Sequence, residues 1–582
     1  MKNLLLSVWT TIVFAGVTAG LPQVLPAQNK AAELPPVTKT FAITHVNVIS
    51  SPGTLLEDVT VIIKNGLISD VGKNVPIPGE AETISADSMF LYAGFIAGLT
   101  HTGIPRPEGN AQSQGDNRPP RENPVNPPAD VAGIQTDQKV IDLFDANEKS
   151  IAGMREAGFT IAHIVPRGKM LPGSGAIVLM REGKSGELIL RKNTAQFSQF
   201  TGASGVYPAT LLGVMAKWKE LYHQASLGLE HETIYEKNPV GVTRPAYEAY
   251  IQAFYPVVKK EQPVIFKAEN VLDIQRAMSL QKELGFSLML AEVKQGWDLT
   301  SKIKSQNVPV FLSLELPKEI AGKKPEEAKK DSAAKEMSLV EKEKAELEKK
   351  QLEAYHLHVS QAAAFEKAGV PFGFSMLEAK PKEALSQIRT MIKNGLSEDA
   401  ALAALTTSPA KLLGISNVTG TVEKGKIANL VLTDKPLFEE KSAVKYVFVE
   451  GKKYEMNEKP AGGKSSASAD VLKVVAGTWN LVISPPQMSA LTGKLVIKNE
   501  GGSLSGNISH ESPEETITAD LDAVESDGKD LRFSYSFDMG GQMATVEVSA
   551  TIEDNKFSGT MTVGELGSFP IEGEKEASPE NN

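Results

Sequence analysis

Cysteine is absent from the 582 residues, and this absence excludes several kinds of chemistry at once. A disulfide, a thiol nucleophile, a cysteine-ligated zinc ion and a lipidated N-terminal cysteine are all ruled out. An excess of positive charge is also lacking, because the formal net charge is −10. A nucleic-acid partner would favour a basic surface, so we expect no nucleic-acid partner.

Long apolar runs are lacking too, apart from the first residues. Residues 4–17 form an apolar segment after Lys2, and small residues follow at 17–19 and 25–27. This pattern is typical of a secretory signal peptide over residues 1–28, with an uncleaved anchor as the alternative. Nothing else approaches the ~18 apolar residues of a membrane span. We therefore expect a soluble mature protein, periplasmic or secreted, with no stable membrane span.

Changes of pattern divide the rest of the chain. Residues 41–72 alternate apolar and polar positions and contain Asn65-Gly66, a strong hairpin signal. Further along, strand and helix patterns alternate as a parallel barrel requires, and short, regularly spaced strands near the end predict a separate all-β domain. The predicted divisions are residues 1–28 (signal peptide), 29–92 (N-terminal segment of a β-sandwich), 93–413 (barrel), 414–456 (C-terminal segment of the same β-sandwich), 457–475 (linker) and 476–575 (all-β domain).

The stretch at residues 90–103, FLYAGFIAGLTHTG, is an apolar run that ends close to a lone histidine, His101. A short apolar run that ends in polar residues is typical of a buried strand that carries side chains to a site. It resembles the motif Pro-Gly-Phe/Leu-Ile-Asp-x-His-x-His, with which the amidohydrolase superfamily begins its barrel. Residues 94–96 match and His101 falls on the second histidine, whereas Leu99 stands at the first histidine and Ala97 at the aspartate.

Three further segments carry the same resemblance. Residues 405–414, LTTSPAKLLG, are similar to the closing helix of the superfamily, and residues 420–434, GTVEKGKIANLVLTD, to its returning β segment. Residues 167–179, RGKMLPGSGAIVL, are similar to a glycine-rich turn of the imidazolonepropionase-like branch. The resemblance implies an α/β fold in which a TIM-type (β/α)8 barrel is joined to a composite β-sandwich built from both ends of the domain. A C-terminal all-β domain is added to this fold.

The superfamily holds its metal ions with His-x-His on strand 1, a carboxylated lysine or a glutamate on strand 4, histidines on strands 5 and 6, and an aspartate after strand 8. Here the strand-5 motif carries Lys267 and Glu269, the strand-6 histidine is Glu292, and residues 373–377 contain no aspartate. A strand-4 ligand is not recognisable. Because zinc prefers imidazole and thiolate ligands, the predicted metal site is degenerate.

The charged replacements suggest a different arrangement. Lys267 and Glu269 lie two residues apart on a predicted strand, so they share a face. We hypothesise that Lys267 replaces the metal electrostatically, paired with Glu269 and Glu292. The candidate catalytic residues are His101, Lys267, Glu269 and Glu292, with no cofactor expected. Two alternatives stay open: one divalent metal ion such as zinc on His101, Glu269 and Glu292, and an inert buried network without a catalytic role.

Other histidines are weaker candidates. His356 and His358 spell His-x-His, but they follow a helical pattern, and two residues on a helix differ by about 200° in direction. They are therefore not expected to share a metal ion. His163 lies on the second predicted barrel strand, where a hydrogen-bonded core histidine is expected.

Two functions from different classes follow. The first is an exported amidohydrolase-family hydrolase that acts on a carbon–nitrogen bond in a small-molecule substrate, such as a non-peptide or cyclic amide. The second is a catalytically silent barrel that binds a small-molecule ligand or pairs with an active homologue; a homo-oligomer fits either function. A third hypothesis places glycan binding on the C-terminal β domain.

Overall fold

The computed structural model of the chain describes residues 39–105, 125–317, 339–456, 475–484, 491–500, 503–511, 516–526, 529–538, 543–563 and 567–576. The predicted signal peptide, residues 1–28, and residues 457–474 of the predicted linker lie outside these ranges. The chain forms two compact units, Met1–Tyr454 and Glu455–Asn582, and each is described by itself. No helix among the described residues is long and apolar enough to cross a membrane.

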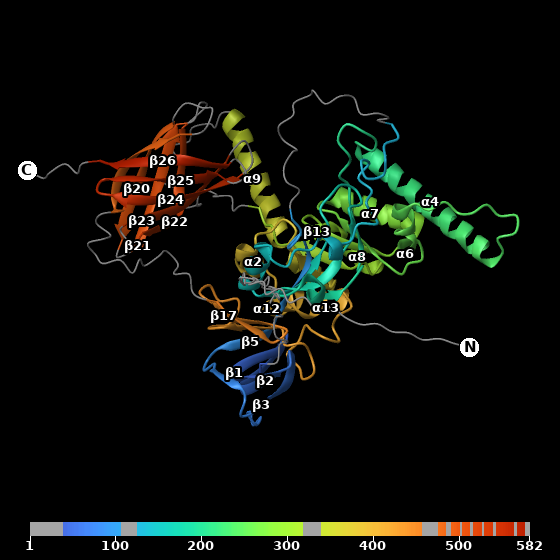
Figure 1. The fold of residues 1–582 in the computed structure, drawn as a ribbon, viewed down its shortest axis with the longest axis horizontal. Helices are drawn as coiled ribbons and strands as arrows, with labels where there is room; N and C mark the ends of the chain where they lie inside the picture. The colour runs from blue at the N-terminus through green and yellow to red at the C-terminus, as the bar shows by residue number, and fades with distance from the viewer. Residues whose placement is uncertain are drawn as a thin grey trace, which may run out of the picture. The chain divides into compact units, whose positions relative to one another are not determined.

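Strands from both ends of the first unit form one sheet, with the order β18-β17-β16-β5-β1-β2-β3 and β4 beside β1 (Figure 1). The two ends meet where β16 pairs antiparallel with β5. These strands are β1 Phe41–Ser51, β2 Thr54–Lys64, β3 Leu67–Gly72, β4 Glu82–Ser85, β5 Phe90–Ala93, β16 Leu430–Thr433, β17 Val444–Val449 and β18 Lys452–Glu455.

The tight turns of this sheet follow from their residues. Asn65 and Gly66 both have positive φ, 52° and 76°, and they join β2 to β3. Glu450 and Gly451, with φ of 48° and 74°, join β17 to β18 in the same way. Two consecutive residues with positive φ match the right-handed twist of the flanking strands, so the hairpin predicted at Asn65-Gly66 is confirmed.

Two further sheets, β10-β9-β7-β6 and β15-β14-β13-β12-β11-β8, make up the middle of the first unit. Within them β6 pairs parallel with β7, and β11 to β15 pair parallel with one another in turn. Their strands are β6 Phe95–Thr100, β7 Phe159–Ile164, β8 Gly173–Ser174, β9 Ala176–Leu179, β10 Ile189–Arg191, β11 Gln196–Gln199, β12 Val264–Lys267, β13 Leu288–Val293, β14 Val310–Ser313 and β15 Phe372–Ser375.

The two sheets approach each other at both sides. After β15, the backbone N–H of Met376 donates to the carbonyl oxygen of Leu99 on β6, at 2.8 Å. The ring of Phe311 on β14 lies beside Gly98 of β6, where an added Cβ would fall 2.0 Å from the ring, so glycine is needed there. On the other side β8 and β9 follow each other in the chain, and β8 pairs antiparallel with β11 while β9 pairs antiparallel with β7. The parallel strands therefore end at a common edge.

Helices connect these strands and cover them. The four-residue and longer helices among the described residues are α1 Val140–Leu143, α2 Ser150–Glu156, α3 Ser185–Leu188, α4 Leu211–Lys237, α5 Ala249–Gln252, α6 Tyr255–Val258, α7 Val271–Leu284, α8 Thr300–Ser305, α9 Leu339–Val359, α10 Gln361–Ala368, α11 Ala384–Lys393, α12 Glu398–Leu405 and α13 Thr407–Leu412. Helix α7 shows how the local sequence determines where a connecting helix begins and ends. Asn270 accepts hydrogen bonds from the N–H groups of Leu272 and Asp273, and Gly285 takes the left-handed conformation that ends the helix.

The second unit is a closed barrel in which each strand pairs with the next and β19 pairs with β26. Alternate residues point inwards, as the buried Trp479, Leu481 and Ile483 of β19 show. The strands are β19 Gly477–Ile483, β20 Leu491–Glu500, β21 Ser503–Glu511, β22 Thr516–Ser526, β23 Asp530–Asp538, β24 Met543–Glu553, β25 Lys556–Val563 and β26 Gly567–Lys575. The predicted combination of an α/β fold with an all-β C-terminal domain is confirmed.

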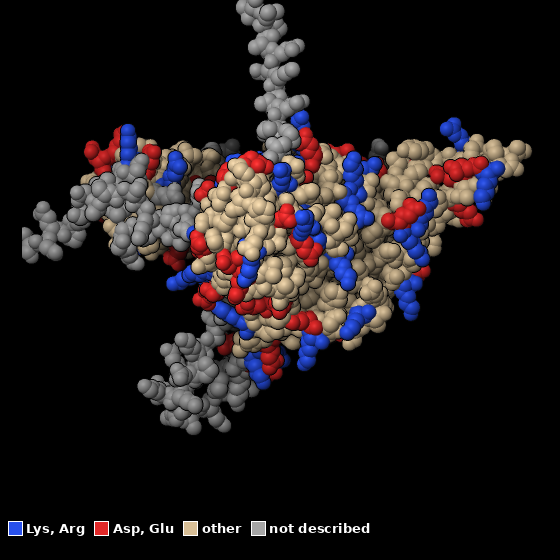
Figure 2. All heavy atoms as spheres, turned by 90° about the horizontal axis from the view of Figure 1, so that it is seen from below, with Lys and Arg blue, Asp and Glu red and all other residues tan. Residues whose placement is uncertain are grey.

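Charges of both signs are mixed over one face of the molecule. On the face shown in Figure 2, lysine and arginine side chains lie among aspartate and glutamate side chains. This distribution agrees with the modest net charge of −10 in 582 residues.

Candidate active site

The candidate residues lie at the carboxyl ends of the parallel strands. His101 follows β6 directly, Lys267 is the last residue of β12, and Glu292 is the penultimate residue of β13. Active sites of parallel barrels form at this edge, because the loops that follow the strands converge there. The fold therefore brings the candidates to one end of the first unit.

His101 is held as a neutral imidazole with a defined tautomer. Its Nδ1 lies 2.8 Å from the carbonyl oxygen of Val165, and because a carbonyl only accepts, Nδ1 carries the proton and Nε2 is the acceptor. Burial lowers the pKa of His101 to about 4; the Val165 hydrogen bond opposes this shift, and the charge of Arg167 adds to it. At neutral pH His101 can therefore accept a proton at Nε2.

Lys267 is paired with two carboxylates at this edge. Its Nζ lies 2.6 Å from Oε1 of Glu378 and 3.9 Å from Oε1 of Glu269. Burial raises the pKa of Glu378, but the hydrogen bond and charge of Lys267, with Lys294 and His101, more than offset this and leave it below its ordinary value. The Glu378 carboxylate thus carries negative charge beside the ammonium group.

The pairing continues onto the neighbouring strands. Nζ of Lys294 lies 2.9 Å from Oε1 of Glu269 and 2.5 Å from Oε2 of Glu315. Burial lowers the pKa of Lys294, and the hydrogen bonds that it donates to Glu315 and Glu269 reverse this and raise it. The backbone also fixes the pairing, since the N–H of Lys294 donates to the carbonyl oxygen of Glu269 at 2.9 Å.

The paired side chains form a chain of alternating charge, which we call the ion-pair arc: Glu378, Lys267, Glu269, Lys294 and Glu315. Lys267 ends β12, and the four others follow β15, β12, β13 and β14 in the same order. Each lysine lies between two carboxylates, so each positive charge is balanced on both sides. The arc as a whole carries one excess negative charge.

Glu292 lies outside the arc. Its side chain is fully buried, and the hydroxyls of Ser313 and Ser375 donate to its two carboxyl oxygens, the second at 2.5 Å. Burial raises the pKa of Glu292, against the two hydroxyl bonds and the charge of Lys294. The prediction that Lys267 pairs with Glu292 is therefore wrong, whereas the expected pairing of Lys267 with Glu269 is present.

A β-bulge explains the direction of Glu292. Leu290 pairs with Val310 and Val293 with Leu312, so one residue more lies between the pairs on β13 than on β14. Glu292 has a φ of 56°, a conformation that non-glycine residues rarely adopt. Strict alternation along the strand fails at such a bulge, so the side chain turns into the serine pair rather than towards Lys267.

The resemblance implies metal ions at this edge, held by histidine and carboxylate side chains. Among the residues that the structure describes, no three histidine or carboxylate side chains come together in a way that could hold a metal ion. His101 is the one histidine among the candidates, Leu99 is buried and apolar, and the carboxylates of the arc already face lysines. The residues present do not fit a metal cluster.

The other three histidines considered above have the local structure that their sequence patterns predict. His163 is fully buried, with Nδ1 3.1 Å from the carbonyl oxygen of Gly98 and Nε2 2.7 Å from the hydroxyl of Thr194, as a core histidine requires. Burial lowers its pKa to about 4. His356 and His358 lie on α9, where Nδ1 of His358 contacts the carbonyl oxygen of Ala354 at 2.8 Å.

Sequence reasoning did not select Lys294, Glu315 or Glu378 as candidates. Lys294 directly follows β13, Glu315 lies two residues after β14, and Glu378 lies three residues after β15. A usable signal was therefore present, because a charged residue lies within three positions after each of β12, β13, β14 and β15. Arg167, which lies near enough to His101 to influence its pKa, has the same position after β7.

Comparisons with known proteins define the class of fold. Residues 356–454 match the sequence model of the amidohydrolase family. The structure of an amidohydrolase from Thermotoga maritima is similar at a TM-score of 0.57 and 21% identity, over 71% of this chain and 100% of that one. At this identity the likeness shows a shared fold alone: the first unit has the fold of a known amidohydrolase.

Other solved structures are similar at lower scores. A putative prolidase from Bifidobacterium longum has a TM-score of 0.43 and 15% identity, over 72% of this chain and 95% of that one. A Xaa-Pro dipeptidase with bound methionine has a TM-score of 0.41 and 14% identity, over 72% and 100%. Nothing further about this chain follows from similarities this weak. No curated protein matches the sequence.

Proposed function

We propose that the first unit is an exported amidohydrolase-family hydrolase that cleaves a carbon–nitrogen bond, in a non-peptide or cyclic amide, with a degenerate metal site. The family match at residues 356–454 and the fold of the Thermotoga maritima amidohydrolase support this proposal. We further propose that the parallel strands form a (β/α)8-type barrel. Within the superfamily, we propose that the chain belongs to the imidazolonepropionase-like branch. The export rests on the apolar pattern of residues 4–17.

The observation that carries the proposal is the state of His101. Its Nδ1 proton is donated to Val165, so Nε2 presents a lone pair, and the charges of Lys267 and Glu378 lie near enough to influence the pKa of the ring. A water held at Nε2 can lose a proton to the imidazole while its oxygen attacks the amide carbon. The ammonium of Lys267 stabilises the negative charge that develops on the amide oxygen, and Glu378 keeps that ammonium in place.

The bond changes balance without a further reactant. The carbonyl carbon gains the water oxygen, the carbon–nitrogen bond breaks, and the leaving nitrogen takes the proton back from the imidazolium. A histidine with a pKa of about 4 is in its basic form at neutral pH but is a weak base. We therefore expect slow turnover.

The test is hydrolysis of hydantoin, dihydrouracil and an Xaa-Pro dipeptide by the full chain in the presence of a chelator. We expect turnover of hydantoin or dihydrouracil, the two cyclic amides, to persist with the chelator and to fall about 100-fold or more in His101→Asn, since general base catalysis contributes on this order. Turnover of the Xaa-Pro dipeptide alone would contradict the proposed substrate class. Lys64→Met, which removes an exposed ion pair with Glu80, is the control and should not change the rate. Turnover that requires added zinc would contradict the proposal.

A second function, a catalytically silent barrel that binds a small ligand or pairs with an active homologue, is favoured by a specific observation. Lys267 and Lys294 are each held between two carboxylates, and Glu292 is fully buried. Groups already satisfied by neighbours are less available to a reacting substrate. Saturable binding of a substrate analogue without turnover of any class would select this function.

A further inference from the structure

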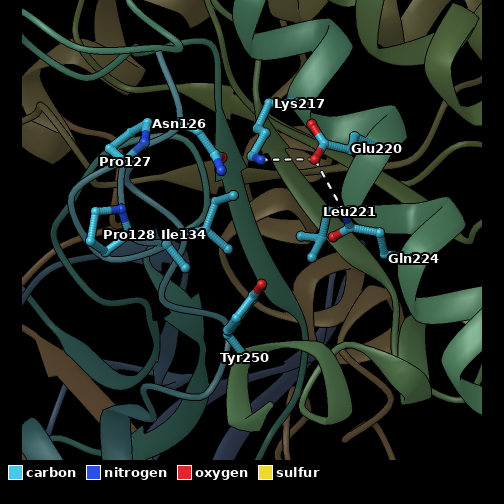
Figure 3. A pocket seen from close by; sticks show the side chains of 10 residues that line it. Asn126, Pro127, Pro128, Ile134, Lys217, Glu220, Leu221, Gln224 and Tyr250 are labelled. Atoms are coloured by element: carbon cyan, nitrogen blue, oxygen red, sulfur yellow. Dashed lines mark hydrogen bonds and ion pairs between the residues drawn. The ribbon is translucent and has the colours of Figure 1, made fainter. Parts of the chain in front are cut away.

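A hollow in the first unit is lined by residues outside the ion-pair arc. It has a volume of about 740 Å³ and lies between α4 and the segment at residues 126–134 that follows β6 (Figure 3). Small-molecule sites usually have volumes of about 300–1,000 Å³, so the hollow has a suitable size. None of its lining residues belongs to the arc.

One wall is a single face of helix α4. Lys217, Glu220, Leu221 and Gln224 line the hollow, and their spacing of three, four and seven residues places them on the same side of the helix. Figure 3 shows the ammonium of Lys217 and the carboxylate of Glu220 side by side at the edge of the hollow. The helix thus presents one positive and one negative group together.

The polar groups of this wall are already oriented. Oε1 of Glu220 accepts from Nζ of Lys217 at 3.0 Å and from Nε2 of Gln224 at 3.1 Å. The side chain of Lys217 is only 15% exposed, so its position is restricted by its surroundings. Both bonds end on Oε1, so Oε2 of Glu220 and the further N–H groups of Lys217 take no part in them.

The opposite wall and the floor are mainly apolar. Pro127 and Pro128 lie across from α4, and Ile134 faces Leu221 between them (Figure 3). Tyr250 of α5 points its hydroxyl towards the same space. Burial raises the pKa of Tyr250 to about 12, together with the hydrogen bond to Glu248, so the hydroxyl stays neutral. The hollow therefore combines a charged pair and further polar side chains, Asn126, Gln224 and Tyr250, with apolar contacts at the two prolines and Ile134.

We propose that this hollow binds a free amino acid with an apolar side chain, with the ligand carboxylate on Lys217 and the ligand ammonium on Oε2 of Glu220. In an amino acid the two charged groups are attached to one carbon atom, so they can face a Lys–Glu pair whose charges lie 3.0 Å apart. The four charges then alternate in sign. The side chain of the ligand contacts Pro127, Pro128 and Ile134.

The charge balance favours a zwitterion over a ligand with a single charge. A carboxylate alone would be attracted by Lys217 and repelled by Glu220, and an amine alone would meet the reverse. A zwitterion satisfies both and leaves the existing ion pair intact. This inference does not depend on the proposed hydrolase function, because it uses none of the residues of that site.

The test is calorimetric titration of the full chain with L-leucine, 4-methylpentanoate and 3-methylbutylamine, which share the side chain but differ in the charged groups. We expect saturable binding of L-leucine and binding of the other two that is weaker by about tenfold or more, the effect of losing one hydrogen bond to a charged group. Equal binding of all three compounds, or no saturable binding of L-leucine, would overturn the proposal.

Variants locate the binding. Lys217→Gln and Glu220→Gln should each weaken L-leucine binding by about ten- to hundredfold. Lys219→Gln on the same helix, which removes a pair with Glu283 instead, should leave it unchanged. The double exchange Lys217→Glu with Glu220→Lys keeps an ion pair and should restore binding, which separates loss of the site from loss of the fold. Binding that is lost in Lys267→Met but not in Lys217→Gln would place the ligand at the arc and overturn the proposal.

Discussion

The ammonium of Lys267 lies 2.6 Å from a carboxyl oxygen of Glu378, which joins the end of β12 to the segment after β15. Lys267 is 19% exposed and Glu378 41% exposed, so the pair is partly shielded from water. Through Glu269 the pairing continues to Lys294 and Glu315. The charged groups at this edge of the parallel strands are therefore balanced by one another.

Removal of the first lysine of the arc should destabilise the first unit. Lys267→Met keeps the aliphatic stem but leaves Glu378 and Glu269 next to each other with less positive charge. We expect the free energy of unfolding to fall by about 1–2 kcal/mol, between the values for exposed and fully buried pairs. Unfolding of the full chain in urea, followed by circular dichroism, measures the change. A loss no larger than that of Lys64→Met, which removes an exposed pair, would show that the arc does not contribute.

Glu292 predicts a dependence of stability on pH with a definite sign. Burial raises its pKa in the folded protein above the ordinary value of 4.5, so the folded state holds its proton longer than the unfolded state. The stability that the protonated form contributes is complete below pH 4.5 and is lost as the pH rises through the folded pKa. Glu292→Gln, which is neutral at every pH, should therefore become more stable relative to the unsubstituted protein as the pH rises. Unfolding free energies of both proteins across this range test the sign, and a constant difference would contradict it.

The buried histidines predict the opposite dependence at acid pH. The pKa values of His101 and His163 are lowered from 6.5 to about 4 by burial, so the unfolded state binds protons first as the pH falls. Their contribution to stability should be lost between pH 6.5 and about pH 4. Nitrogen NMR of the imidazoles should show His101 neutral at neutral pH, with its proton on Nδ1. His45, whose pKa Asp58 raises, is the internal control, and a titration of His101 near 6.5 would disprove its burial.

Much of the fold followed from patterns that act over short distances. The apolar run that ends at His101 forms β5 and β6, and Asn65-Gly66 forms the predicted hairpin. Apolar periodicity and turn residues report on local backbone geometry, so they were sufficient for these elements. The alternation of short strands after residue 476 likewise identified an all-β domain.

The candidate site was only partly predictable, because its details depend on contacts between strands. The match to the strand-6 motif placed Glu292 beside Lys267, but the bulge in β13 turns it towards Ser313 and Ser375. A bulge depends on the register with β14, which no single segment of sequence encodes. Lys267 pairs with Glu378, which lies 111 residues away in the chain. This pairing depends on which strand ends lie close together in the fold, so it was missed for the same reason.

The central claim is that the ion-pair arc, rather than a divalent cation, balances the charges at the edge where His101 and Lys267 lie. Metal analysis of the purified, dialysed full chain by mass spectrometry tests this claim most directly. We predict far less than one divalent ion per chain, because each arc carboxylate is already paired with a lysine. One tightly bound divalent ion per chain, lost in His101→Asn, would contradict the claim.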